Sequence, residues 1–214
     1  MNFSTAAEQL IEVSRDFYRR GWVLGTSGNF SVVLEEDPLR LAITASSMDK
    51  GQLAANQIVQ VGESGQLLQS AEDYRSSAET LLHLAVVRSR VAGAVLHTHS
   101  VYSTSLSDFY KEDGRFFIEG YEMLKGLSGV STHEHREWLP ILENSQDMEK
   151  LSSEAEDLLL VNPELHGFLI HRHGLYTWGK DLADARRHVE ILEFLFEAIV
   201  LRQLMRMGAP EGRK

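Results

Sequence analysis

Two histidines separated by one residue, His97 and His99, follow an apolar segment and could together bind a metal ion. Alternate side chains of an extended strand point to the same face and lie about 7 Å apart, so one ion could bridge both imidazoles. A catalytic zinc ion takes three protein ligands and keeps a fourth position for water or substrate. The pair therefore predicts a divalent metal site that needs a third ligand. On the pair alone, two surface histidines remain the alternative.

His173 is the best candidate for that third ligand. A second apolar segment, residues 165–170, is followed by His171 and His173, and Gly174 permits a sharp turn directly after it. His171 shares a strand face with His173, and we expect it to support the site or the structure. Because the sequence contains no cysteine, any ligand cluster must come from His, Asp and Glu.

Four other histidines are interpreted as non-ligands. His133 and His135 lie in a polar stretch that no apolar strand precedes, so we expect both to be solvated. His83 and His188 lie on predicted helices among charged neighbours, which favours surface or capping positions.

Three short segments combine hydroxyl side chains with backbone N–H groups, which donate hydrogen bonds to a phosphate monoester. They are residues 25–29, residues 44–47 and the pair Ser76-Ser77. None is a Walker loop or a dinucleotide fingerprint. Since Ser, Gly and Asn also build ordinary turns and caps, each segment alone leaves the structural alternative open.

Two glutamates have open roles. Glu79 fits the last position of a capping box that starts at Ser76, so it is either a helix cap or a group of the site. Glu122 lies between the two histidine segments, where composition alone predicts a surface glutamate.

Helices and strands that would position these residues follow from the spacing of apolar side chains. We predict helices around residues 7–18, from residue 76 onward and around 185–199, the last ending at 208–210. We predict strands at residues 30–34, 39–44, 57–61, 91–97 and 165–170, with connections at 35–38 and 62–65. The irregular alternation predicts an α/β fold in which helices flank a mixed central sheet, as a single domain over residues 1–214.

Composition excludes several classes of function. The sequence has 21 basic and 31 acidic residues, and a formal charge of -10 would repel nucleic acid. No segment resembles a signal peptide or is apolar for long enough to cross a membrane. We therefore expect a cytoplasmic protein with neither nucleic acid nor membrane as a partner.

Four motifs together resemble the class II aldolase and adducin head family over almost the whole chain. They are residues 25–29, 76–79, 97–100 and 171–174. Within the family, residues 77–83, 122–126, 140–144 and 173–179 are most similar to the branch that dehydrates 5-methylthioribulose 1-phosphate. The resemblance implies the family's three-layer fold. It also implies conversion of this phosphorylated ketose to 5-methylthio-2,3-dioxopentyl phosphate in methionine salvage.

The resemblance also implies roles for individual residues. One zinc ion per subunit would bind His97, His99 and His173, and Glu122 would shuttle protons. The substrate phosphate would lie near Asn29, Ser46, Ser47, Ser76 and Ser77. Glu79 would contact the substrate, or serve as an extra ligand or base as in related aldolases; its position corresponds to a substrate-contacting cysteine of animal dehydratases.

The family is known for homotetramers with active sites between subunits, so the resemblance implies that a neighbouring subunit could complete this site. Two alternatives remain. The first is another enzyme on this scaffold, a sugar-phosphate aldolase or a pentulose-phosphate 4-epimerase. The second is a non-catalytic adducin-like binding module, against which the three retained histidines argue.

Overall fold

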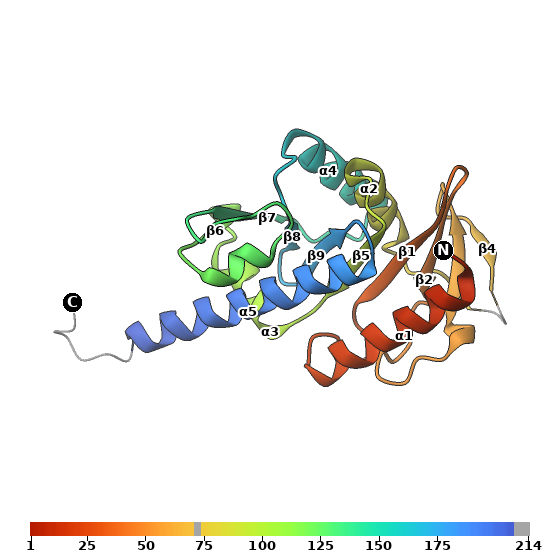
Figure 1. The fold of residues 1–214 in the computed structure, drawn as a ribbon, viewed down its shortest axis with the longest axis horizontal. Helices are drawn as coiled ribbons and strands as arrows, with labels where there is room; N and C mark the ends of the chain where they lie inside the picture. Colours follow the sequence, from red (N-terminus) through yellow and green to blue (C-terminus); the bar gives the residue numbers. More distant parts are fainter. Residues whose placement is uncertain (71–73, 208–214) are drawn as a thin grey trace.

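The computed structural model describes residues 1–70 and 74–207, and a nine-stranded sheet forms the centre of this part of the chain (Figure 1). The strands lie in the order β4-β3-β2-β1-β5-β9-β8-β7-β6. Only β7 and β8 are parallel among the paired neighbours of the described sheet, so the prediction of a mixed sheet is confirmed. The bounds are β1 Asn29–Glu36, β2 Leu39–Thr44, β3 Ile58–Gly62, β4 Leu67–Gln69, β5 Ala94–Thr98, β6 Arg115–Glu119, β7 Arg136–Leu142, β8 Gly167–Ile170 and β9 Gly174–Gly179.

Helices cover both faces of the sheet, as predicted for an α/β fold. Helices α2 and α4 pack on one face, and α1 and the start of α5 pack on the other. The α-helices are α1 Phe3–Arg19, α2 Thr80–Arg90, α3 Val101–Phe109, α4 Met148–Val161 and α5 Leu182–Met207, and two short 3₁₀-helices are η1 Ala55–Gln57 and η2 Glu122–Gly126. None of the described helices is long and apolar enough to span a membrane.

The side chains of β5 alternate between two hydrophobic cores, one on each face of the sheet. Val95 packs into the core beneath α2 and α4, whereas Ala94 and Leu96 pack into the core beneath α1. Successive residues of a strand point to opposite faces, so a strand buried on both sides is continuously apolar. This is why residues 94–97 lack polar alternation although they form a strand. The predicted start at residue 91 is wrong, because Val91 caps the C-terminal end of α2 and β5 begins at Ala94.

The predicted helices and strands are largely confirmed, and several more are present. Five predicted strands correspond to β1, β2, β3, β5 and β8, and the hairpin-like connection at 62–65 joins β3 to β4. The second helix begins at Thr80 rather than Ser76. The structure adds α3, α4, β4, β6, β7 and β9 to the sequence interpretation. The predicted helix end at 208–210 lies outside the described residues.

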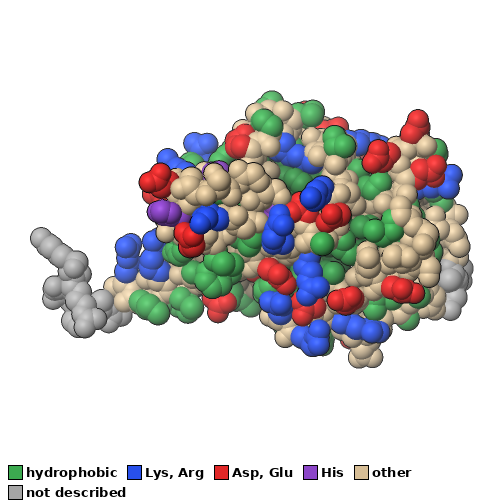
Figure 2. All heavy atoms as spheres, viewed as in Figure 1, with side chains coloured by type: hydrophobic (Ala, Val, Ile, Leu, Met, Phe, Trp, Pro, Cys, Tyr) green, Lys and Arg blue, Asp and Glu red, His purple; other side chains and the backbone are tan. Residues whose placement is uncertain are grey.

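The C-terminal part of α5 projects from the body of the molecule (Figure 1). Its apolar side chains are exposed, with Leu204 at 58%, Met205 at 71% and Met207 at 84% relative accessibility. Figure 2 shows apolar side chains along this part of the molecule. An exposed apolar stretch of this kind commonly marks an interaction surface.

Candidate metal centre and adjoining cavity

Strands β5 and β9 bring the three predicted ligands together. The strands are antiparallel neighbours, and Thr98 pairs with Leu175, so the end of β5 lies beside the start of β9. A Cβ atom added to Gly174 would lie 1.9 Å from the Thr98 carbonyl oxygen. Glycine is therefore required for His173 to approach His97 and His99 this closely.

The imidazole nitrogens of the triad converge on one point. The Nε2 atom of His97 lies 2.7 Å from Nε2 of His99 and 3.3 Å from Nε2 of His173. The Nδ1 atom of His97 donates to the Leu175 carbonyl at 2.9 Å, which leaves its Nε2 as a lone-pair donor. Lone pairs at this separation repel unless a cation or proton lies between them. The three residues therefore fit a divalent metal ion, as the sequence predicted.

Burial keeps these imidazoles neutral. It lowers the pKa of His97 well below the usual value, an effect that the nearby His173 reinforces. It lowers the pKa of His99 to about 2, with His97 and His173 contributing. A neutral imidazole is the form that binds a metal ion, so little proton competition is expected near pH 7.

Glu79 is the N-cap residue of α2, but its side chain faces the triad. Its Oε1 and Oε2 atoms lie 3.4 Å from Nε2 of His173 and 3.7 Å from Nε2 of His97. Its side chain makes no capping hydrogen bond to α2, so the capping-box interpretation is wrong. Ser76 instead bridges to Ala45, and α2 starts only after this bridge. The Asn29 amide donates to Oε2 of Glu79.

A cavity of about 280 Å³ opens beside the triad, and the predicted anion loops line it. His99, His173 and Glu79 form one side. Among the phosphate candidates, Asn29, Ser46, Ser47 and Ser77 line the cavity, together with Thr26 and Ser27. Ser76 is not one of the lining residues. Hydroxyls and backbone from loops distant in sequence thus meet next to the metal candidate, which suits a phosphorylated ligand.

Lys50 is a cavity residue that the sequence interpretation missed. Its side chain is 1% exposed, and its Nζ donates to the carbonyl oxygens of Met48 at 2.9 Å and Thr26 at 3.4 Å. Burial lowers the pKa of Lys50 to about 8, although Asp49 and Glu79 act in the opposite direction. Lys50 is the sole Lys or Arg among the described lining residues, so it supplies positive charge in a strongly acidic protein.

Asn144, Gln146 and Met148 form a further wall of this cavity. They lie between β7 and the first residue of α4. The sequence interpretation assigned them no role, although Asn144 ends the motif at 140–144, because their position beside the triad depends on the parallel pairing of β7 with β8.

Two histidines expected at the surface are buried. His83 is 0% exposed, and its ring contacts the Ser31 hydroxyl at 2.7 Å and the Asn29 side chain. His188 is 2% exposed and its Nδ1 lies 2.7 Å from the Trp178 carbonyl oxygen. Both expectations were wrong because α2 and α5 each pack one face on the sheet. His83 positions Asn29, which in turn contacts Glu79.

The other histidines divide between confirmed and corrected expectations. His133 is exposed, with 57% of its side chain accessible. His171 bonds to Asp108 at 3.1 Å, outside the triad, in agreement with a structural role. His135 is not simply solvated, because its Nε2 lies 2.8 Å from the buried carboxylate of Glu137. The polar stretch in fact leads into β7, which places Glu137 in the interior.

Within a single chain, Glu122 lies outside the cavity beside the triad. It begins η2, its side chain is 72% exposed, and it pairs with Lys125 at 2.6 Å and with His133 at 3.8 Å. The Lys125 ammonium lowers the pKa of Glu122. Glu122 does not line the cavity beside the triad.

Comparison with known proteins gives a consistent result. The Class II Aldolase and Adducin N-terminal domain matches residues 8–200. A methylthioribulose-1-phosphate dehydratase of Marinobacter nauticus is 45% identical over 196 residues, covering 91% of this chain and 92% of the relative. The Sorangium cellulosum enzyme of the same name is 43% identical, covering 94% and 93%.

Solved structures agree on the fold. The Thermus thermophilus L-fuculose-1-phosphate aldolase superimposes with a TM-score of 0.74 at 20% identity, covering 97% of this chain and 100% of the aldolase. The Escherichia coli YgbL structure gives a TM-score of 0.78 at 24% identity, covering 93% and 90%. At these identities the similarity concerns the fold alone.

Proposed function

Since this chain belongs to the class II aldolase and adducin N-terminal domain family, we propose that it dehydrates 5-methylthioribulose 1-phosphate to 5-methylthio-2,3-dioxopentyl phosphate in methionine salvage. The observation that carries the proposal is 45% identity to a methylthioribulose-1-phosphate dehydratase over 91% of this chain. The cavity beside the triad supports it, because it combines ligands for a metal ion with groups for a phosphate. We expect the enzyme to act in the cytoplasm.

The triad is proposed to hold one zinc ion per subunit through His97, His99 and His173. When bound, zinc supplies Lewis-acid stabilisation for negative charge that develops on the substrate oxygens, an effect of several kcal/mol. The same ligands also accept iron, cobalt or manganese. Zinc is the proposal because neutral imidazoles in a three-ligand cluster are typical of its catalytic sites.

The polar loops are proposed to bind the substrate phosphate. Hydroxyls of Ser46, Ser47 and Ser77 line the cavity, and Lys50 adds a buried positive charge. The Asn29 amide is already directed at Glu79, so we assign Asn29 to orienting this carboxylate as well as contacting substrate. Ser76 is kept as a weaker phosphate candidate, acting through the loop that it bridges to Ala45.

Glu122 is proposed to transfer the protons. It would take the proton from C3 and deliver one to the hydroxyl that leaves C4 as water, and the remaining enol would become the 2,3-diketone. Because Glu122 lies outside the cavity of its own chain, we propose that it enters the site of a neighbouring subunit. We propose a homotetramer as the assembly, and the exposed apolar end of α5 is a candidate contact surface.

Glu79 is the rival for proton transfer, because it faces the triad within the same chain. Co-expression of Glu122→Gln with His99→Ala separates the two assignments. If Glu122 acts across an interface, random mixing leaves roughly one quarter of the sites intact, and activity returns to about that level. If Glu122 acts within its own chain, the mixture is as inactive as its two parents. If Glu122 plays no part, the Glu122→Gln parent is itself active. Glu79→Gln with His99→Ala is the matched control and should give no rescue.

Product analysis tests the function itself. The metal-loaded protein is incubated with 5-methylthioribulose 1-phosphate, and the product is identified by NMR. A phosphorylated 2,3-diketone is expected. A three-carbon ketose phosphate with an aldehyde would identify an aldolase, and an epimeric pentulose phosphate would identify an epimerase, so either would overturn the proposal.

A further inference from the structure

A second cluster of metal-binding side chains lies outside the cavity at the triad. His135, Glu137 and His166 offer ligand atoms that all lie within 4.8 Å of one another. They come from the segment before β7, from β7 itself and from the residue before β8. The triad and this cluster are the two such groups in the described part of the chain.

The centre of the cluster is a buried carboxylate. Glu137 is 2% exposed, and its Oε2 atom lies 2.8 Å from Nε2 of His135 and 2.9 Å from Nδ1 of His166. Its Oε1 atom accepts from the His166 backbone N–H at 3.3 Å. A buried carboxylate requires a compensating positive charge. A divalent cation between the two imidazoles and the carboxylate would supply it.

The surroundings of His166 are those of a metal ligand. Its Nε2 donates to the Ser128 carbonyl oxygen at 2.8 Å, which fixes the ring and aims Nδ1 at Glu137. His97 in the triad has the same arrangement, with its Nδ1 donating to Leu175. Such a bond from the second ring nitrogen to a carbonyl oxygen is usual for histidines that bind metals.

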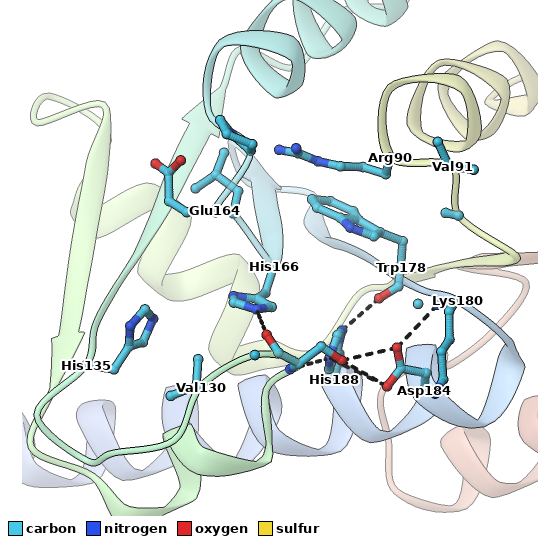
Figure 3. Close-up of a pocket in the computed structure, with 16 residues that line it drawn as sticks. Arg90, Val91, Val130, His135, Glu164, His166, Trp178, Lys180, Asp184 and His188 are labelled. Atoms are coloured by element: carbon cyan, nitrogen blue, oxygen red, sulfur yellow. Dashed lines mark hydrogen bonds and ion pairs between the residues drawn. The ribbon is translucent and has the colours of Figure 1, made fainter.

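The cluster also has access and room for further ligands. His135 and His166 line a cavity of about 550 Å³, and Figure 3 shows the two rings on facing sides of one end of it. Arg90 lies beside Trp178 in another part of the wall. Water or a small ligand in this cavity could therefore complete the coordination.

The cluster is more open than the triad. The ring centroids of His135 and His166 are 6.3 Å apart, whereas those of the triad are 4.4 to 4.9 Å apart. His135 must therefore move inward to bind, which its position before β7 and the 28% exposure of its side chain allow. We expect weaker binding than at the triad for this reason.

We propose that His135, Glu137 and His166 form a second site for a divalent transition metal, separate from the triad. Two imidazoles and one carboxylate suit zinc, cobalt, nickel or iron better than magnesium or calcium. The competing occupant is a proton, which would make His166 a cation paired with Glu137 and leave no metal site. This inference does not rest on the proposed dehydratase activity.

Zinc titration of the full chain, after removal of bound metal with a chelator, tests the inference. Calorimetry and metal analysis should give about two zinc ions per chain, in a tighter and a weaker phase. His135→Ala and Glu137→Gln should each lose the weaker phase and retain about one ion. His99→Ala should lose the tighter phase. His133→Ala, in the same segment but outside the cluster, is the matched control and should retain both.

A wild-type chain that binds only about one zinc ion would overturn the proposal, as would a weaker phase that persists in both cluster variants. Circular dichroism checks that the Glu137→Gln variant is folded. If it is not, His135→Ala decides the question, because His135 is partly exposed and lies before the strand.

Discussion

Replacing the buried Lys50 by Met should weaken substrate binding and remove a pH-dependent part of the stability. The fall in the pKa of Lys50 from 10.5 to about 8 means that burying the charged ammonium lowers the free energy of unfolding by about 3 kcal/mol below pH 8. Between these values the unfolded chain holds the proton and the folded chain has lost it, so wild-type stability rises as pH increases from 8 to 10.5. The variant should lack this rise. Loss of a charged hydrogen bond to phosphate, about 1.5–3 kcal/mol, should raise KM roughly 10- to 100-fold.

Urea denaturation of the metal-free protein at pH 7 and pH 10 measures the first effect, and steady-state kinetics measures the second. Lys150→Met on α4, whose side chain is 65% exposed, is the matched control and should alter neither quantity. Equal pH dependence in the wild type and Lys50→Met would show that burial of the ammonium is not destabilising. An unchanged KM would show that Lys50 does not serve the phosphate.

Three further predictions follow from contacts around the triad. Burial raises the pKa of Glu193 to about 7, so the metal-free protein should lose about 3 kcal/mol of stability as pH rises from 4.5 to 7. Urea denaturation should show that Glu193→Gln lacks this loss. Gly174→Ala should destabilise the fold by about 1–3 kcal/mol and lower the zinc content, because its Cβ would meet the Thr98 carbonyl. A variant with the same denaturation midpoint and zinc content as the wild type would contradict this. His97→Ala should lose both the tightly bound metal and turnover, and a variant that keeps either would exclude His97 as a ligand.

The metal candidate could be predicted because its signals are local. An apolar run followed by His97 and His99 identifies a buried strand end, and Gly174 marks a place where two backbones approach closely. Only the pairing of β5 with β9 had to be added to bring His173 into the cluster. Strand periodicity and the conformational freedom of glycine can both be recognised within a short stretch of sequence.

Other site residues depend on long-range packing and could not be read from the sequence. In the sequence Lys50 resembles any surface lysine, and only the fold buries it and brings its ammonium group to the carbonyl oxygens of Thr26 and Met48. At Glu79 a valid local pattern, the capping box, competed with the bridge between Ala45 and Ser76, and the bridge prevailed. His83 was misassigned because helical spacing does not reveal how much of a helix surface the sheet and neighbouring helices cover.

The cavity beside the triad is lined partly by residues at the ends of central strands and partly by residues of a loop. His97 lies on β5 and His173 directly precedes β9, whereas Asn144 and Gln146 belong to the connection between β7 and α4, and Met148 is the first residue of α4. Sequence changes in that connection can therefore reshape what the enzyme accepts while the central strands keep the ligand positions constant. Such a separation lets substrate range diverge over evolutionary time, and it marks residues 143–147 as the place to begin when altering selectivity by design.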